Sequence, residues 1–418
     1  MIKYKRFITI IAISFISIHL KVCAQSGPDY FIFKDSLYDN PIDAANLKSL
    51  RIPFKAKMRS YYFFQDLTTN KKEALALGGS LSWNPSIVSN HITGRVTLAT
   101  SQRIYGQLER DGTMLLKPGQ EGFTVLQEYA LQFKKNKFLL NVGAREMNSP
   151  LLNTSDVRML PATHRGIDIN YLFKEDSYIS FGVIDQIKWI NSDRFIDLYE
   201  FAGFDRNELV WGTANRYKTD IMAFGLYYLN AKDYYHGLYT EYYREFSLKG
   251  NPIKIGIQYM HENDIGDGIG GDFNFNMLGT KLDFYLFGLK SFIGYTNVLS
   301  VDKAQEVWSI MPYYNMMIFN FFNRPKEQSV KLGVILKLSE VLNLYPNMGF
   351  GFTPNSGDAA SPNQQEYNLT LDYTFLKDFN LKVRGAFVHQ NSIRNLDLTS
   401  KDIVDFRVIL NYKWSNKF

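Results

Sequence analysis

The chain has 418 residues, with 47 lysines and arginines, 41 aspartates and glutamates, and one cysteine. The formal net charge is +6, but four positive charges and the cysteine fall in the first 24 residues, so residues 25–418 are close to neutral. This composition excludes a disulfide framework and a cysteine-based metal site in residues 25–418, and it gives no indication of nucleic-acid binding.

Residues 1–24 have the pattern of a secretory signal peptide, with three basic residues, an apolar run from Phe7 to Leu20 and small residues before Gln25. A retained membrane helix is the weaker interpretation, because the apolar run is shorter than the ~20 residues that a span needs. Lipid attachment at Cys23 is also disfavoured, because a lysine stands two residues before it. We expect cleavage after residue 24 and export of the rest of the chain.

Residues 25–52 lack a clean pattern and are expected to form a periplasmic N-terminal lead-in. From residue 53 to residue 418, apolar and polar residues alternate in many short segments, and a strand sends such alternate side chains to opposite faces. The first segments, in chain order, are 57–64, 78–83, 92–100 and 125–133. The 27 tyrosines and 32 phenylalanines suit a sheet with aromatic girdles. No segment after residue 24 approaches 18 uninterrupted apolar residues, so helical spans are not expected.

Very short polar turns join neighbouring segments at 134–137, 174–176 and 376–378, which indicates antiparallel pairing. Longer stretches rich in Gly, Asn, Asp and Pro separate these hairpins, at 107–121, 148–163, 191–207, 261–272, 353–365 and 390–401. Short turns on one side and long loops on the other are typical of outer-membrane barrels, and the chain length predicts about 16 to 18 strands. We expect an all-β transmembrane antiparallel barrel of 18 strands, with 16 as the alternative, whose short turns are periplasmic.

The last segment, Ile403 to Phe418, predicts the closing strand of this barrel. One parity is apolar from Phe406 onward and is expected to face lipid; the other is charged, with Ile409 as an apolar exception. We expect a seam with the first strand near Tyr61, and recognition of the C-terminal strand ending in Phe418 by the barrel-assembly machinery. A soluble β-sandwich that buries the apolar parity is the rival fold.

Charged residues occupy the parity that would face the lumen near the C-terminus. Lys382 and Arg384 share one face of the penultimate strand, Arg407 lies on the final strand, and Asp372 and Asp405 are acids on neighbouring strands. One interpretation is a hydrated lumen whose charges neutralise one another. The other is a line of cations along one wall of a pore, which attracts anionic solutes and passes them from site to site.

The sequence contains no recognisable catalytic or metal-binding motif. Six histidines are present, none in an HExxH or paired-ligand spacing, so we expect no catalytic residue, no metal and no cofactor. Asp264 to Asp272 superficially resembles a calcium loop but lacks the acidic spacing of an EF-hand. A barrel enzyme is therefore the least favoured function, behind a channel and behind a surface receptor or assembly scaffold.

Several motifs resemble those of the OprD-type outer-membrane porins. The run Asn148-Ser-Pro-Leu-Leu-Asn-Thr-Ser-Asp-Val-Arg-Met-Leu-Pro-Ala-Thr-His-Arg-Gly166 is similar to that family's signature, a proline and aliphatics followed by an Asn/Asp-x-Arg-Leu-Leu-Pro segment. Three further stretches agree with the family, in the same order along the chain: Met58-Arg-Ser-Tyr-Tyr-Phe63, Leu381-Lys-Val-Arg-Gly-Ala386 and Asp405-Phe-Arg-Val-Ile409. The resemblance extends from about residue 55 to residue 418.

The resemblance implies a monomer or loose trimer of 18-stranded barrels, each with a pore narrowed by inward-folded loops. It also implies a ladder of basic residues that guides small carboxylate-bearing solutes, such as amino acids. The residues that match the family's motifs are Arg158, Lys382, Arg384 and Arg407, with Arg165 less secure, and Asp156 of the signature run is expected to be a lumen acid. Lys382 departs from the usual arginine and is a point charge without the planar fork, which leaves the solute open.

Overall fold

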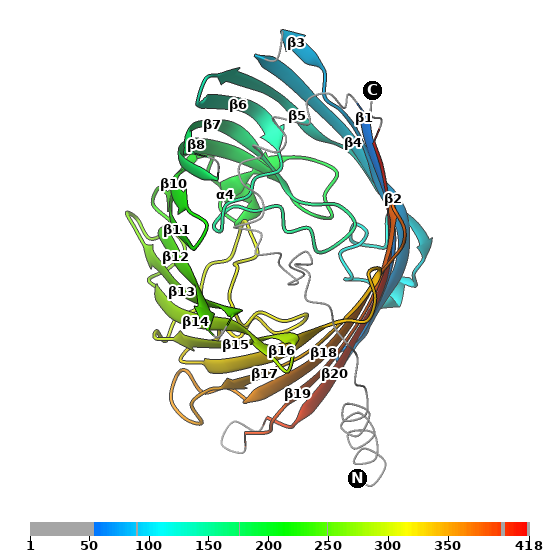
Figure 1. Ribbon diagram of the computed structural model, residues 1–418, viewed down its shortest axis with the longest axis vertical. Helices are drawn as coiled ribbons and strands as arrows, with labels where there is room; N and C mark the ends of the chain where they lie inside the picture. Colours follow the sequence, from blue (N-terminus) through cyan, green and yellow to red (C-terminus); the bar gives the residue numbers. More distant parts are fainter. Residues whose placement is uncertain (1–53, 89–90, 175, 249, 394–397, 416–418) are drawn as a thin grey trace.

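In the computed structural model, the described residues 54–415, apart from 89–90, 175, 249 and 394–397, form a closed antiparallel barrel (Figure 1). The predicted signal peptide (1–24), the lead-in (25–52) and Phe418 lie outside these residues. The rival soluble sandwich is wrong, because the strands close into one ring instead of two packed sheets. The helices of the described part are the single turns η1 (Leu108–Arg110) and α4 (Leu198–Phe201), and neither is long and apolar enough to cross a membrane.

Eighteen strands make the wall, which confirms the predicted number. They are β1 (Phe54–Asp66), β2 (Lys71–Trp83), β4 (Ile92–Tyr105), β5 (Phe123–Lys135), β6 (Phe138–Arg145), β7 (Thr163–Lys174), β8 (Ser177–Lys188), β10 (Val210–Lys218), β11 (Met222–Ala231), β12 (Tyr235–Leu248), β13 (Asn251–Asp264), β14 (Asn274–Leu286), β15 (Leu289–Val298), β16 (Gln328–Lys337), β17 (Leu342–Phe352), β18 (Gln364–Leu376), β19 (Phe379–Gln390) and β20 (Lys401–Ser415). Two short strands, β3 (Ser86–Val88) and β9 (Ile196–Asp197), pair only with β4 and β8.

The seam between β1 and β20 closes the barrel in the predicted place, with Tyr61 opposite Ile409. Along β20 the two parities separate as expected: Phe406 is exposed on the outside, whereas Arg407 is buried towards the lumen. Ile409, the exception to the charged parity, packs inside the barrel with Tyr61 and Phe63. The inner face at the seam is therefore partly apolar, and aromatic side chains lie beside the lumen charges.

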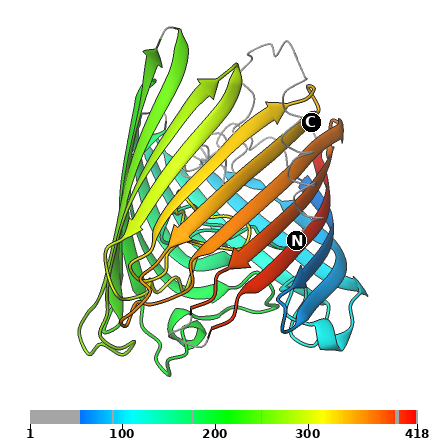
Figure 2. The same ribbon diagram turned by 90° about the horizontal axis from the view of Figure 1, so that it is seen from below.

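Short turns lie at one end of the barrel and most long loops at the other, and the tilted strands between them are clear in Figure 2. The three predicted hairpins are confirmed as β5–β6, β7–β8 and β18–β19. All six predicted loops lie at the second end, here called the loop end, and the first is called the turn end. The longest loop, residues 299–327 between β15 and β16, lacks the Gly-rich composition of the others and was not predicted.

The loops 146–162, 189–209 and 299–327 fold into the barrel instead of away from it (Figure 1). Trp308 of the last loop is buried, stacks on Tyr235 at a ring distance of 5.5 Å and donates from Nε1 to the carbonyl oxygen of Leu198 at 2.9 Å. On the other side of the loop, Phe322 packs against Gly349 of β17. A Cβ at Gly349 would lie 2.7 Å from the Phe322 ring, so the absence of a side chain there lets the loop approach the strand closely. These contacts fill much of the loop-end half of the lumen.

Candidate functional site

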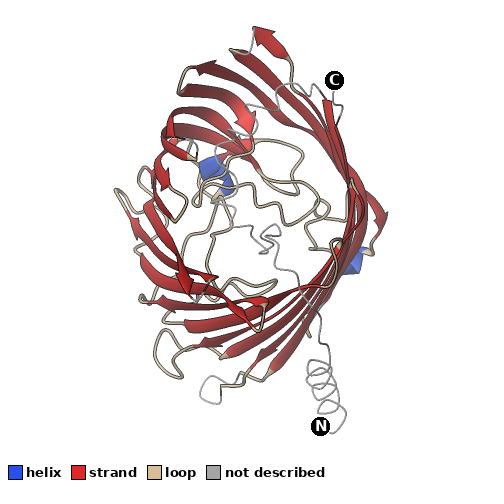
Figure 3. Ribbon diagram, in the orientation of Figure 1, coloured by secondary structure: helices blue, strands red, loops and turns tan. Residues whose placement is uncertain are grey.

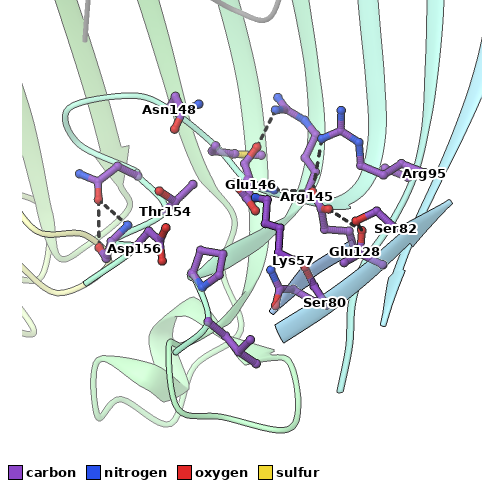
Figure 4. Close-up of a pocket in the computed structure, with 18 of the residues that line it drawn as sticks. Lys57, Ser80, Ser82, Arg95, Glu128, Arg145, Glu146, Asn148, Thr154 and Asp156 are labelled. Carbon is purple, nitrogen blue, oxygen red and sulfur yellow. Dashed lines mark hydrogen bonds and ion pairs between the residues drawn. The ribbon is translucent and has the colours of Figure 1, made fainter. Parts of the chain in front are cut away.

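A cavity of about 1410 Å³ occupies the turn-end half of the lumen. Its wall comes from β1, β2, β4 to β8, β10, β11 and β18 to β20, and residues 146–161 of the first inward loop cover it. Figure 4 shows Glu146, Asn148, Thr154 and Asp156 of this loop facing strand residues such as Lys57. The inward loops therefore divide the lumen into this cavity and a packed region towards the loop end.

Charges of both signs line the cavity. The cations are Lys55, Lys57, Arg59, Arg95, Arg145, Lys377, Lys382 and Lys413, and the acids are Glu128, Glu146, Asp156, Asp168 and Asp378. Among the described residues, no three His, Cys, Asp or Glu side chains are arranged to hold a metal ion. The arrangement is that of a hydrated compartment for polar solutes.

Asp156 lines the cavity and ties the first inward loop to the barrel seam. Its carboxylate lies 2.8 Å from Nη1 of Arg59 on β1, and Arg59 Nε donates to Asn411 Oδ1 of β20 at 2.8 Å. Burial acts to raise the pKa of Asp156, but the Arg59 ion pair outweighs it and holds this pKa below its usual value. The loop is thus anchored by an ionised carboxylate.

Glu146, at the start of the same loop, has a different environment. Burial is the main cause that raises its pKa to about 7, and the nearby charges of Glu128 and Asp156 act in the same direction. Lys57 and Arg95 act in the opposite direction. One acid of the cavity therefore changes its charge near neutral pH.

Three of the predicted ladder residues gather beyond the cavity, where the loop meets the seam. Arg384 of β19 lies directly opposite Arg407 of β20, and Arg407 lies opposite Phe63 of β1. The guanidinium carbons of Arg407 and of Arg158 from the loop lie 4.7 and 4.9 Å from the centre of the Phe63 ring, a cation–π geometry. We call Arg158, Arg384 and Arg407 the arginine cluster.

Among the described residues, Arg407 is the one member of the arginine cluster with a carboxylate partner. Arg407 binds Asp405 through Nε and Nη2, at 2.6 and 2.9 Å, and Asp405 also accepts from Gln65 Nε2 at 2.9 Å. Asp405 therefore lies buried on the inner face of the seam and neutralises Arg407.

Arg158 and Arg384 are held differently. Arg158 donates to the backbone carbonyls of Thr113 and Val157 at 2.9 and 3.0 Å. The buried Nε of Arg384 has no hydrogen-bond partner among the described residues. Burial lowers the pKa of Arg158 to about 10, and repulsion by Arg407 and Arg384 contributes to the shift. Arg158 and Arg384 are therefore buried beside Arg407, and neither has a carboxylate partner among the described residues.

The fourth ladder residue, Lys382, lies two residues from Arg384 along β19 and lines the cavity. Its Nζ is 3.2 Å from Asp372 of β18, the residue directly opposite, so Asp372 also faces the lumen. Alternate residues of a strand are roughly 7 Å apart on one face. The basic line therefore continues from the arginine cluster to the cavity.

Arg165 does not join this line, and its placement corrects the expectation from the signature run. On β7 it shares the parity of Ile167 and Ile169, which are 52% and 46% exposed on the outer face. Its Nε lies 3.0 Å from the carboxylate of Asp185 on β8. The physical reason is the alternation of side chains along β7. The expectation rested only on the nearness of Arg165 to the signature run, but the inward position at this point of the strand belongs to His164.

The structure adds two features that the sequence reasoning missed. Lys57 and Arg59 line the cavity, and they could have been found because they share a parity with Tyr61 and Phe63 in the first predicted strand. The acids Glu128 and Glu146, which lie close to Lys57 and Arg95, could not have been found in this way, because a β-bulge in β5 precedes Glu128 and Glu146 lies in a loop.

Residues 113–416 match the protein-family model described as "outer membrane porin, OprD family". The chain belongs to the OprD family. No curated protein matches the chain significantly. OpdK of Pseudomonas aeruginosa, solved with vanillate, superimposes with a TM-score of 0.74 at 16% identity over 87% of this chain and 98% of its own. A BenF-like porin of Pseudomonas fluorescens Pf-5 superimposes with a TM-score of 0.77 at 17% identity, over 87% of this chain and 98% of its own. OccAB3 of Acinetobacter baumannii superimposes with a TM-score of 0.75 at 13% identity, over 86% of this chain and 99% of its own.

This OprD-family protein is therefore a porin, a channel for small solutes in the Gram-negative outer membrane, and not an enzyme. The membership also decides against the receptor or scaffold interpretation. Its turn end is the periplasmic end and its loop end the extracellular one.

Proposed function

We propose that this porin is selective for small carboxylate-bearing solutes, such as amino acids, which cross it passively along the basic residues of the seam. The observation that carries the proposal is the arginine cluster, in which Arg158 and Arg384 have no described carboxylate partner. Buried charges without a partner are costly, so the cluster favours an anion beside it. Arginine also stays charged and binds a carboxylate through two parallel hydrogen bonds.

The neighbouring residues support a route in steps. From the arginine cluster a carboxylate would reach Lys382, and then the facing pair Lys57 and Lys413 on β1 and β20 near the periplasmic exit. Each of these steps keeps the carboxylate near a cation, and no single site is isolated enough to retain it. Lys382 binds Asp372, so it offers a weaker site than the arginines.

An acid beside the route supports amino acids within this class. Glu146 lines the cavity close to Lys57 (Figure 4) and forms no ion pair among the described residues, whereas Glu128 and Asp168 are each paired with an arginine, Arg95 and Arg145. A solute with both a carboxylate and an ammonium group would find Lys57 and the ionised Glu146 near each other.

Liposome swelling with the purified protein tests the proposal. Glutamate and the neutral sugar arabinose have similar sizes, and only glutamate carries carboxylates, so the rate ratio reports carboxylate selection and not pore width. We expect faster entry of glutamate than of arabinose at equal concentration and low ionic strength. Equal rates would refute the selectivity, and the absence of any flux would refute an open channel.

The contacts of the barrel with its surroundings are also proposals. We propose that the exposed outer side chains, such as Leu369 and Phe406, contact lipid, and that the assembly machinery recognises the C-terminal strand. Sedimentation in detergent would distinguish a monomer from a loose trimer, since a closed barrel is compatible with both.

A further inference from the structure

A hollow of about 450 Å³ lies on the outer surface of the barrel near its periplasmic end. Its floor is a row of apolar residues directly opposite one another on four strands: Ile92, Phe133, Leu140 and Ile169 of β4, β5, β6 and β7. Phe138 also lines the hollow. This is a depression in the lipid-facing wall, distinct from the lumen and from the proposed solute route.

Aromatic rings mark the depth of the hollow in the membrane. Phe138 lies directly opposite Tyr171 on β7, and the two rings are 4.9 Å apart. Both side chains are exposed, at 53% and 38%. Aromatic girdles of this kind occupy the interface between the acyl chains and the headgroups, so the hollow adjoins the headgroups of the periplasmic leaflet.

Basic residues border the hollow on its periplasmic side. Lys135 has the outward parity of Phe133 and lines it, together with the exposed ring of His91, whose backbone oxygen accepts from the Lys134 amide at 2.8 Å; Lys134 itself has the inward parity of its partner Leu139. Lys137 completes the turn, and its Nζ lies 3.4 Å from the carbonyl oxygen of Phe173 on the neighbouring hairpin. Among the described residues, none of these three lysines forms an ion pair with a carboxylate.

Other periplasmic turns of the described chain differ from this one. Lys337 lies 2.9 Å from Glu340 in the β16–β17 turn, and Lys218 lies 3.1 Å from Asp176. A lysine with an adjacent acid has little attraction for a further anion, whereas the β5–β6 turn has three lysines in four residues. The positive charge is therefore concentrated where the apolar hollow lies.

We propose that this hollow binds an anionic phospholipid of the periplasmic leaflet, such as phosphatidylglycerol. One acyl chain lies in the hollow against Phe133 and Leu140, and the headgroup phosphate lies on Lys135. The lysine stem follows the apolar surface while its ammonium group reaches the headgroup level. The combination of an acyl-sized apolar hollow and unpaired cations at the interface favours a lipid over a soluble anion, which has no use for the hollow.

Native mass spectrometry of the folded full-length protein in detergent tests the proposal, with phosphatidylglycerol and phosphatidylcholine as probes. We expect one phosphatidylglycerol to be retained in preference to phosphatidylcholine. The variant K135Q should bind phosphatidylglycerol about fivefold more weakly, because the removed lysine no longer attracts the anionic headgroup. Two matched controls should bind it like the wild type: K337Q, at a turn whose lysine is already paired, and K134Q, on the inward parity of the same strand.

A second variant, L140W, fills the hollow and keeps the lysines. It should lose the retained phosphatidylglycerol as well, because the acyl chain no longer fits. Wild-type affinity of either K135Q or L140W for phosphatidylglycerol would overturn the proposal, as would equal retention of both lipids by the unmodified protein. Unchanged heat-modifiable gel mobility of each variant establishes that its barrel is folded.

Discussion

The substitution Arg384→Gln tests the arginine cluster most directly. The change removes one positive charge, keeps a polar side chain, and leaves the Arg407–Asp405 pair in place. Because Arg384 has no described carboxylate partner, no acid is left unpaired by the change. Any effect on anionic solutes therefore comes from the lost attraction and not from a new repulsion.

The size of the effect follows from the interaction that is removed. A hydrogen bond to a charged group contributes about 1.5–3 kcal/mol, and a unit charge at about 5 Å with an effective dielectric constant of about 20 contributes about 3 kcal/mol. Because the arginine cluster adjoins a hydrated cavity that screens charges, we take the lower of these free energies, about 1.5 kcal/mol. A loss of about 1.5 kcal/mol weakens carboxylate binding about tenfold, and at concentrations well below saturation the flux falls in proportion to occupancy.

The assay is liposome swelling with glutamate and arabinose. We expect R384Q to lower the glutamate rate about tenfold and to leave the arabinose rate nearly unchanged. The conservative variant R384K should retain an intermediate glutamate rate, because lysine keeps the charge but not the bidentate fork. R165Q is the matched control: the same change on the outer face, beside Asp185, should not alter the rate ratio of the two solutes.

Two results would refute the reasoning. If R384Q slows glutamate and arabinose equally, the residue shapes the pore and does not select charge. If R165Q changes the ratio as much as R384Q does, the selection arises from the overall charge of the barrel and not from the cluster.

Three further predictions concern other parts of the lumen. R407Q should lower the glutamate rate more than R384Q does, because it leaves the buried carboxylate of Asp405 without its arginine partner. The double variant D405N/R407Q, which also removes that carboxylate charge, should recover part of the glutamate rate. Liposome swelling measures the rates of both variants. Raising the pH from 6 to 8 ionises Glu146, whose pKa is about 7, so reversal potentials in a salt gradient should shift towards cation selectivity, and E146Q should reduce the shift. W308A removes a buried side chain that anchors the longest inward loop, at a cost of about 3–5 kcal/mol to its packing. Planar-bilayer recordings of the variant should show larger and noisier single-channel conductance, and a variant trace as quiet as that of the wild type would contradict the anchoring role.

The alternation of side chains was enough to predict the wall of the barrel. Each strand must turn one face to an apolar surrounding and the other to a polar one, and this requirement is local, so it is visible in segments as short as the hairpin at 134–137. The seam near Tyr61 followed from the closure of the barrel, because the last strand must pair with the first as well as with the strand before it. Family motifs added the inward loop with Arg158.

The tertiary structure alone decided the interior. The loop 299–327 has no alternation, and it folds inward because its apolar side chains, with Trp308 at their centre, find a buried surface only within the lumen. The arginine cluster joins a loop, β19 and β20, and only the register of the seam determines that Arg158 and Arg407 meet at Phe63. Arg165 shows the converse: nearness in sequence to a motif does not place a side chain inside, because the face it occupies depends on strand parity. Local pattern thus determined which residues form the wall, whereas contacts between distant segments decided which charges face the solute.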